Sequence, residues 1–224
     1  MSPPALLLPA LAALLATAAQ AQSSCSSDGQ PPPVALLERF ISADCDDCWT
    51  RATAQPKKGE LAIDWIAPGA RGDDAPLSAA ATRDALERLQ TLKRKPPSPV
   101  DTLRSARRDG AGGLRVAQGP AFNGYLGASI EAPDAGRGPF TGWLALVETL
   151  PAGTEGSPVE RNLVRNLLVV PWPAAAGARF EARPMALPEG AHPDRLRVVG
   201  WLADSRGVMR AISESKCAPE EERR

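Results

Sequence analysis

The sequence predicts two domains of different class, an α/β domain followed by an antiparallel β-sandwich. Three observations lead to this prediction. The first part of the chain alternates strand patterns with helix patterns as far as Leu92, which favours parallel strands covered by helices. The later part, from Leu114, is a series of short strand patterns separated by turn residues. Between them lies a stretch rich in proline and basic residues, which is typical of a linker.

The chain begins with MSPPALLLPALAALLATAAQA, which carries no charged side chain and consists mainly of alanine and leucine. The apolar stretch from Ala5 to Ala19 has the length of a signal-peptide core and is short for a membrane span. Ala19 and Ala21 supply the small residues of a cleavage site. We expect residues 1–21 to be a signal peptide cleaved after Ala21, and the mature protein to be periplasmic or secreted without a membrane anchor. Residues 22–30 form a polar leader.

The composition excludes several classes of function. The chain has 26 basic and 26 acidic side chains, so nothing indicates nucleic acid or an anionic membrane as a partner. It has one histidine, His192, and neither a phosphate-binding loop nor a Gly-x-Ser-x-Gly motif, so most hydrolase mechanisms are hard to assemble. We expect no cofactor. The sequence does not indicate an oligomeric state.

The first domain is expected over residues 31–113. Val34 to Ser42 is a buried strand pattern, and a two-cysteine motif follows it directly. Trp49 to Gln55 can form a short helix. Glu60 to Ala67 alternates apolar and polar residues, which predicts a second strand. Leu77 to Leu92 has the strongest helical pattern of the chain.

In that helix, Ser78 is expected as the N-cap and Asp84 with Arg88 as an i,i+4 ion pair. Residues 93–113 are expected to be a linker with a short helix near Val100 to Arg107. Its lysines and arginines are expected to be solvated rather than to form a binding patch, because the net charge of the chain is zero.

The β-sandwich is expected over residues 114–217, and residues 218–224 are a polar tail. The tryptophans of this part sit in or beside strands and are expected in the core or an interface rather than on a ligand platform. The expected strands are LRVAQG, FNGYLGASIEA, GWLALVETL, NLVRNLLVVPW, ARFEARPMAL, RLRVVGWLAD and GVMRAISES.

The stretch FISADCDDCWT places Cys45 and Cys48 among three aspartates. A Cys-x-x-Cys pair that follows a strand and opens a helix is the thioredoxin arrangement. There the N–H groups of the helix N-terminus stabilise the thiolate of the first cysteine. The aspartates act in the opposite direction, because negative charge raises the pKa of a nearby cysteine. We therefore expect either a reductant-like pair or an inert disulfide.

Two further features of this stretch remain open at the level of sequence. Glu38, on the preceding strand, is either a buried proton acceptor beneath the cysteine pair or an ordinary carboxylate at an exposed strand edge. Four cysteines allow three pairings. We expect Cys45–Cys48, with Cys25–Cys217 as the second bridge, because an exported protein favours disulfides. There is no second Cys-x-x-Cys motif, so we expect no metal site.

The segment LERFISADCDDCW resembles a known family. Glu38, Phe40, Ser42, Cys45 and Cys48 match the signature Glu-x-Phe-x-Ser-x-x-Cys-x-x-Cys of a family of exported bacterial proteins of unknown function. The segments NLVR and VVGWLADSRGVMRAI are similar to the β-rich C-terminal region of that family. The resemblance implies a thioredoxin-like first domain and an exported location, and it implies no substrate.

We expect this thioredoxin-like domain to be reduced in size, with much of the usual substrate-docking edge missing. Between Leu92 and Leu114 only Pro97 and Pro99 are candidates for the cis-proline loop that docks substrates in that superfamily.

Two functions of different class follow. The first is thiol–disulfide exchange with protein thiols or disulfides, in which Cys45 attacks and Cys48 resolves. The second is a non-catalytic binding or envelope-associated module in which the Cys45–Cys48 bridge is static. An exposed Cys45 sulfur beside a groove favours the first function, and a covered sulfur favours the second.

Overall fold

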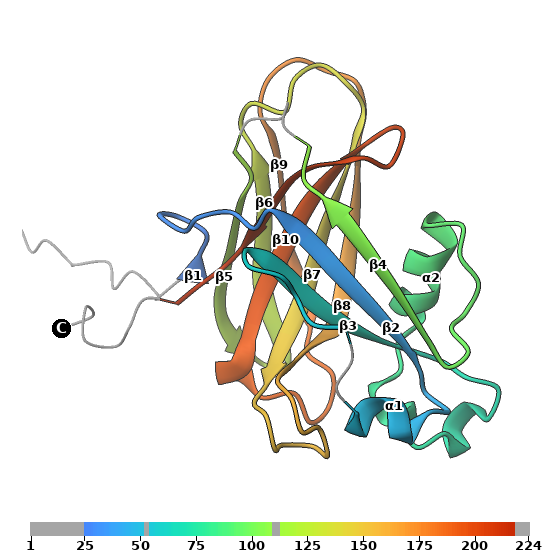
Figure 1. Cartoon of the computed structure of the whole chain (residues 1–224). Coiled ribbons are helices and arrows are strands. Elements are labelled where there is room, and N and C mark those ends of the chain that lie inside the picture. Colours follow the sequence, from blue (N-terminus) through green and yellow to red (C-terminus); the bar gives the residue numbers. More distant parts are fainter. Residues whose placement is uncertain (1–24, 52–53, 109–112, 218–224) are drawn as a thin grey trace, which may run out of the picture.

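The computed structural model describes residues 25–51, 54–108 and 113–217, and these residues form two β-sheets and two α-helices (Figure 1). The expected signal peptide and the polar tail lie outside the described residues. The strands are β1 (Cys25–Ser26), β2 (Ala35–Ser42), β3 (Glu60–Ala67), β4 (Val100–Ala106), β5 (Arg115–Phe122), β6 (Tyr125–Ala132), β7 (Phe140–Leu150), β8 (Arg161–Trp172), β9 (Arg179–Ala186), β10 (Leu196–Asp204) and β11 (Met209–Glu214). The α-helices are α1 (Asp46–Thr50) and α2 (Arg83–Thr91), and the short 3-10 helices are η1 (Gly72–Asp74), η2 (Ser78–Ala80) and η3 (Pro193–Arg195).

Strands from both parts of the chain share one sheet. Seven strands follow the order β11-β10-β7-β8-β3-β2-β4, and a second sheet has the order β1-β5-β6-β9. Strand β2 pairs with β3 in parallel and with β4 in antiparallel. Strand β3 meets β8 through one parallel residue pair, Asp64 and Leu163. This junction joins the strands before Gly113 to strands that follow it.

The predicted fold class, a reduced thioredoxin-like α/β domain followed by a separate antiparallel β-sandwich, is therefore wrong. The protein is mostly β, and β2, β3 and β4 extend the larger sheet instead of forming a separate α/β unit. The expected linker contains β4 in place of a short helix, and pairing with β2 satisfies the backbone of this strand. Local patterns do not report such long-range pairing, which depends on packing partners elsewhere in the chain.

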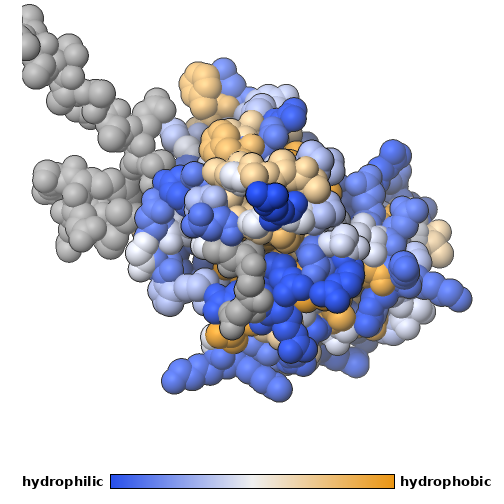
Figure 2. All heavy atoms as spheres, turned by 90° about the horizontal axis from the view of Figure 1, so that it is seen from above, coloured by the Kyte–Doolittle hydropathy of each residue, from blue (hydrophilic) through white to orange (hydrophobic). Residues whose placement is uncertain are grey.

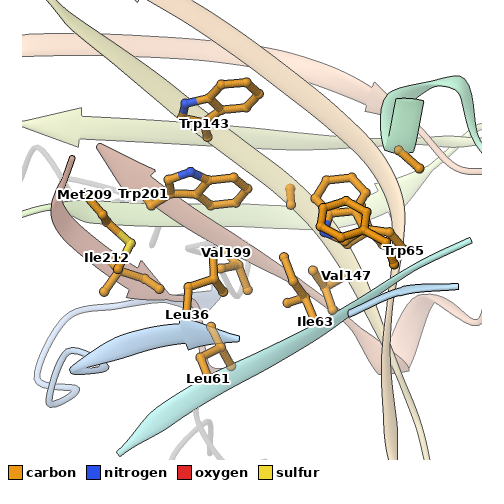
Figure 3. Packing of buried hydrophobic residues seen from close by; sticks show 14 of the residues in the cluster. Leu36, Leu61, Ile63, Trp65, Trp143, Val147, Val199, Trp201, Met209 and Ile212 are labelled. Carbon is orange, nitrogen blue, oxygen red and sulfur yellow. The ribbon is translucent and has the colours of Figure 1, made fainter. Parts of the chain in front are cut away.

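Strands β7 and β10 are buried on both faces. Leu144 and Leu146 of β7 contribute to a hydrophobic cluster with the four-stranded sheet. Trp143 and Val147 of the same strand point to the opposite cluster, where Trp201 of β10 also lies (Figure 3). Because neither face is solvated, the usual alternation of apolar and polar residues is absent, and the segments read as almost continuous apolar runs.

The seven-stranded sheet curls, so that its two edge strands approach each other. The backbone N–H of Arg108, just after β4, donates to the carbonyl oxygen of Met209 at the start of β11, at 2.9 Å. The enclosed cluster takes side chains from β2, β3, β7, β8, β10 and β11, and Ala85 and Leu89 of α2 complete it. Helix α2 thus packs against the interior of the curled sheet.

The strongest predicted helix is shorter than expected. Helix α2 begins at Arg83, and the Thr82 Oγ1 accepts a hydrogen bond from the Ala85 N–H at 3.3 Å. The predicted N-cap, Ser78, instead begins η2 and donates its hydroxyl to the Asp73 carbonyl oxygen at 3.0 Å. Thr82, four residues after Ser78, is the residue that caps α2. The predicted helix therefore began too early, because both residues are of a type that caps helices.

Asp204 closes the β10–β11 hairpin, and its contribution to stability is expected to depend on pH. It accepts hydrogen bonds from the N–H groups of Arg206 at 2.9 Å and Val208 at 3.0 Å, and from Arg210 at 2.7 Å. Burial raises the pKa of this carboxyl, but the three donors outweigh burial and hold the pKa below its ordinary value. Such a group contributes stability above its unfolded pKa and loses this contribution as the pH falls through its folded pKa.

We therefore expect Asp204→Asn to lower the free energy of unfolding at pH 7 and to have a smaller effect below about pH 4, where the unfolded carboxyl is protonated. Urea denaturation of wild type and variant at pH 7 and pH 3 measures this difference. An equal loss of stability at both pH values would contradict the assigned role of the Asp204 charge.

Candidate redox site

Cys45 and Cys48 form a disulfide where β2 ends and α1 begins. Ser42 is the last residue of β2, and its carbonyl oxygen accepts from the Cys45 N–H at 3.0 Å. The Cys45 carbonyl oxygen in turn accepts from the Cys48 N–H at 3.2 Å. A tight turn therefore brings the two sulfurs together at the C-terminal edge of a buried strand. Both cysteine residues are half-buried.

Cys45 lines an open pocket of about 590 Å³. Three loops form the pocket: the turn after β2, the loop after β3, and the proline-rich segment before β4. The Ser98–Pro99 peptide bond in that segment is cis. Cys48 is not in the pocket wall and packs partly against the hydrophobic cluster around Trp49. The lining residues are Ser42, Asp44, Cys45, Pro68, Gly69, Ala70 and Pro96 to Pro99.

The three aspartates of the motif have different roles. Asp44 accepts hydrogen bonds from the N–H groups of Ala70 at 2.7 Å and Arg71 at 3.2 Å, so it fixes the loop after β3. A Cβ atom at Gly69 would overlap the Asp44 carboxylate, so a larger residue at this position would displace the carboxylate from the loop. Asp47 pairs with Arg51 at 3.0 Å on the surface. The negative charge near the cysteines is therefore partly compensated at two of the three positions.

Arg161 binds the carbonyl groups at the C-terminal end of α1. This fully buried guanidinium donates to the carbonyl oxygens of Trp49 and Arg51, each at 2.8 Å, and to Ser157 Oγ at 3.0 Å. It also lies 3.3 Å from a carboxylate oxygen of Asp64. Burial lowers the pKa of Arg161 and the charge of Asp64 raises it in part, leaving the pKa below its ordinary value. Arg161 thus connects the cysteine helix to the first residue of β8.

Asp64 is the centre of a buried network on the same face of the sheet. Its other oxygen accepts from Arg39 at 2.6 Å and from the Asn162 N–H at 3.1 Å. Arg39 also donates to the Ala54 carbonyl oxygen at 3.2 Å. Asp64 therefore lies between two arginines, and the network crosses the β3–β8 junction that joins the two parts of the chain.

Trp49 anchors the hydrophobic face of α1. Its ring lies 5.0 Å from the Arg161 guanidinium, and its indole N–H donates to the Glu155 carbonyl oxygen at 2.7 Å. It packs in a cluster with Ile41 and Ile66. The motif is therefore fixed on one side by Trp49 and Arg161, while Cys45 on the other side borders the open pocket.

Glu38 points away from this network. Side chains alternate along a strand, so Glu38 and its neighbour Arg39 face opposite sides of β2. Glu38 is fully buried, and its two oxygens accept from Arg88 at 2.8 and 2.7 Å. The reading of Glu38 as a carboxylate at an exposed edge is wrong. Arg88 pairs with Glu38 and not with Asp84, so the predicted i,i+4 pair is also wrong.

The second disulfide joins Cys25 of β1 to Cys217 near the end of the described chain. Beside it, Ser26 and Lys216 exchange two backbone hydrogen bonds of 3.1 and 2.9 Å. This bridge ties the two ends of the described chain together.

Among the residues that the structure describes, one group of side chains has metal-ligand chemistry. Ligand atoms of Glu148, Glu155 and His192 lie within 4.8 Å of one another. Arg165 occupies this place already, because it lies 2.6 Å from Glu148 and 4.0 Å from Glu155. Its positive charge is bound to the two carboxylates that a cation would need, so the group is an ion-pair cluster.

Three residues of the buried network were not predicted from the sequence: Arg39, Asp64 and Arg161. Asp64 could have been noticed, because an aspartate inside the apolar strand ELAIDWIA must find a buried partner. No local pattern indicates Arg161, whose partners at the end of α1, Trp49 and Arg51, lie more than a hundred residues earlier in the chain.

The chain matches no protein-family model, no curated protein and no solved structure. The resemblance of its cysteine segment to an exported family stays a prediction. Among the described residues, no helix has the length and apolar character needed to cross a membrane.

Proposed function

We propose that this protein exchanges disulfides with protein thiols through Cys45 and Cys48. The observation that carries the proposal is the position of Cys45, which is half-buried and forms part of the wall of an open pocket of about 590 Å³. A static bridge needs no access, whereas exchange requires a thiolate to reach one sulfur. The fixed far side of α1 keeps the motif in place while its pocket side stays open.

The reaction follows from the two environments. A partner thiolate attacks Cys45 Sγ, the Cys45–Cys48 bond breaks, and Cys48 leaves as a thiolate that takes up a proton. The second thiol of the partner then loses its proton and attacks the partner's first sulfur, which is bonded to Cys45. The mixed disulfide breaks and Cys45 is released. Two electrons and two protons pass from the partner dithiol to the cysteine pair, and the reverse sequence reduces a partner disulfide.

The Cys48→Ser variant tests this proposal. Its remaining Cys45 thiolate is expected to attack disulfides of partner proteins and to stay joined to them in mixed disulfides, because no resolving thiol is present to release them. The measurement is non-reducing electrophoresis with mass spectrometry of the trapped species. In the matched Cys45→Ser variant the remaining thiol lies beside the Trp49 cluster, and much less trapping is expected. Equal trapping by the two variants, or none by either, would contradict the assignment of Cys45.

The cellular location of the protein is part of the same proposal. Two disulfides are compatible with a secreted protein. We infer export to the periplasm or the medium, with cleavage after Ala21. The mass and N-terminal sequence of the mature protein test this cleavage site directly.

A binding function without turnover remains the second candidate, and exposed hydrophobic residues favour it. Phe122 and Tyr125 at the β5–β6 hairpin are 74% and 54% exposed, and Phe180 of β9 is 61% exposed. An open groove of about 530 Å³ lies on the same sheet, lined mainly by small residues of β5, β6 and β9. Elsewhere, on the face seen from above, hydrophobic residues gather in one area of a mostly hydrophilic surface (Figure 2). Under this function, Phe180→Ser abolishes partner binding and Cys48→Ser traps nothing.

A further inference from the structure

A separate cavity of about 400 Å³ lies at the edge of the curled sheet and shares no lining residue with the Cys45 pocket. The C-terminal end of α2, strand β4, the start of β7 and the β10–β11 hairpin surround it. Its volume lies within the range of small-molecule sites. The described residues therefore enclose a space of ligand size where the two edges of the larger sheet meet.

Arg88 is the buried charged group of this cavity, which Lys93, Asp204 and Arg206 also line. The residue is 6% exposed, and it lines the cavity from α2. Its Nε and Nη2 atoms donate to Glu38, but its Nη1 atom has no hydrogen-bond partner among the described residues. The guanidinium carbon lies 4.6 Å from the ring centre of Trp143 and 5.2 Å from that of Trp201. A cationic donor is thus held in place by two aromatic rings and a carboxylate, with one of its nitrogen atoms free.

The two indoles add donors of the same kind. Trp143 and Trp201 both line the cavity, and their rings stack with centres 5.7 Å apart. Both ring nitrogens are buried, and neither has an acceptor among the residues that the structure describes. Figure 3 shows these nitrogens at the same end of the stacked pair. Buried donors without acceptors cost free energy. The two indole N–H groups beside this cavity therefore favour binding of an acceptor from outside the chain.

We propose that this cavity binds a small carboxylic acid with an apolar body. A carboxylate is an acceptor with two oxygens, which suits a set of donors that includes a guanidinium. Lys93 and Arg206 add positive charge at the rim. The two nearby carboxylates are already paired, Glu38 with Arg88 and the lining residue Asp204 with Arg210. Leu36, Leu92 and Met209 supply apolar wall for the rest of the molecule. The inference does not depend on exchange at Cys45.

Nuclear magnetic resonance of the oxidised protein, with benzoate and hexanoate as probes, tests the proposal. We expect the indole N–H signals of Trp143 and Trp201 to shift and to saturate with one bound ligand. Trp143→Phe and Trp201→Phe assign these signals while keeping an aromatic ring. The indole N–H of Trp49, which already donates to Glu155, is expected not to shift.

Two variants of β4 form a matched pair for the same titration. Ser105 lines the cavity and Thr102 does not. Their side chains leave opposite faces of the strand, since odd and even positions alternate. We expect Ser105→Phe to weaken benzoate binding about tenfold or more, and Thr102→Phe to leave it unchanged.

Three results would overturn the proposal. In the first, neither acid shifts the two indole signals at millimolar concentrations, which would mean that only water occupies the cavity. In the second, benzamide binds as tightly as benzoate, which would exclude recognition of the carboxylate charge. In the third, Ser105→Phe and Thr102→Phe have equal effects, which would place the acid at another site.

Discussion

Replacement of Arg161 by methionine is expected to lower the free energy of unfolding by about 3–5 kcal/mol, the usual cost of breaking a buried charged network by removing one partner. Methionine keeps much of the side-chain volume but leaves the carbonyl oxygens of Trp49 and Arg51 without their donor. It also removes one of the two arginines beside Asp64. Urea denaturation of the oxidised protein measures the loss.

The matched control is Arg183→Met. Arg183 pairs with Glu181 on the surface and its side chain is 61% exposed, so its loss is expected to cost less than about 1 kcal/mol. Arg161→Met is also expected to speed reduction of Cys45–Cys48 by dithiothreitol, because the end of α1 loses its anchor. A stability change as small as that of Arg183→Met would contradict the role given to Arg161.

Replacement of both Cys25 and Cys217 by serine is expected to cost about 5 kcal/mol of stability. The bridge spans a sequence separation of 192 residues. Such a long closed loop greatly restricts the unfolded chain, and in the chain-entropy account the stabilisation grows with the logarithm of loop length. Chemical denaturation of the double variant against wild type measures the loss.

The matched control is the double variant of Cys45 and Cys48, which are separated by three positions. The same relation gives a loss of about 2 kcal/mol for this short loop. A larger loss for the Cys45–Cys48 pair than for the Cys25–Cys217 pair would mean that the short bridge is the structural one. That result would also weaken the proposal that it opens during function.

The sequence predicted individual strands better than their assembly. The strands β2 and β3, which end at Ser42 and Ala67, lie close to where their sequence patterns place them. The same is true of the strands after Leu114. The pattern of β4 was missed, because VDTLRSA has few apolar residues and follows three prolines. The single pair of Asp64 and Leu163 that joins β3 to β8 has no local signature. The expected domain boundary at Gly113 therefore divides strands that belong to one sheet.

The candidate site was predictable where it depends on neighbouring residues. Spacing alone brings Cys45 and Cys48 together at the start of a helix, as the structure shows. The support beneath them comes from Arg161 and the loop at Glu155, which lie in a distant part of the sequence. Glu38 was singled out as a partner of the cysteines, but strand alternation turns it to the opposite face, where Arg88 binds it.

The central claim is that the Cys45–Cys48 bridge opens during function, and a redox titration of the mature protein tests it most directly. Mass mapping at each potential identifies which cysteines are paired. The proposed function predicts that Cys45–Cys48 opens between about −120 and −270 mV, nearer the reducing end because of the flanking aspartates, while Cys25–Cys217 stays closed. If Cys45–Cys48 stays closed to below about −300 mV, it is a structural bridge and the exchange function is wrong.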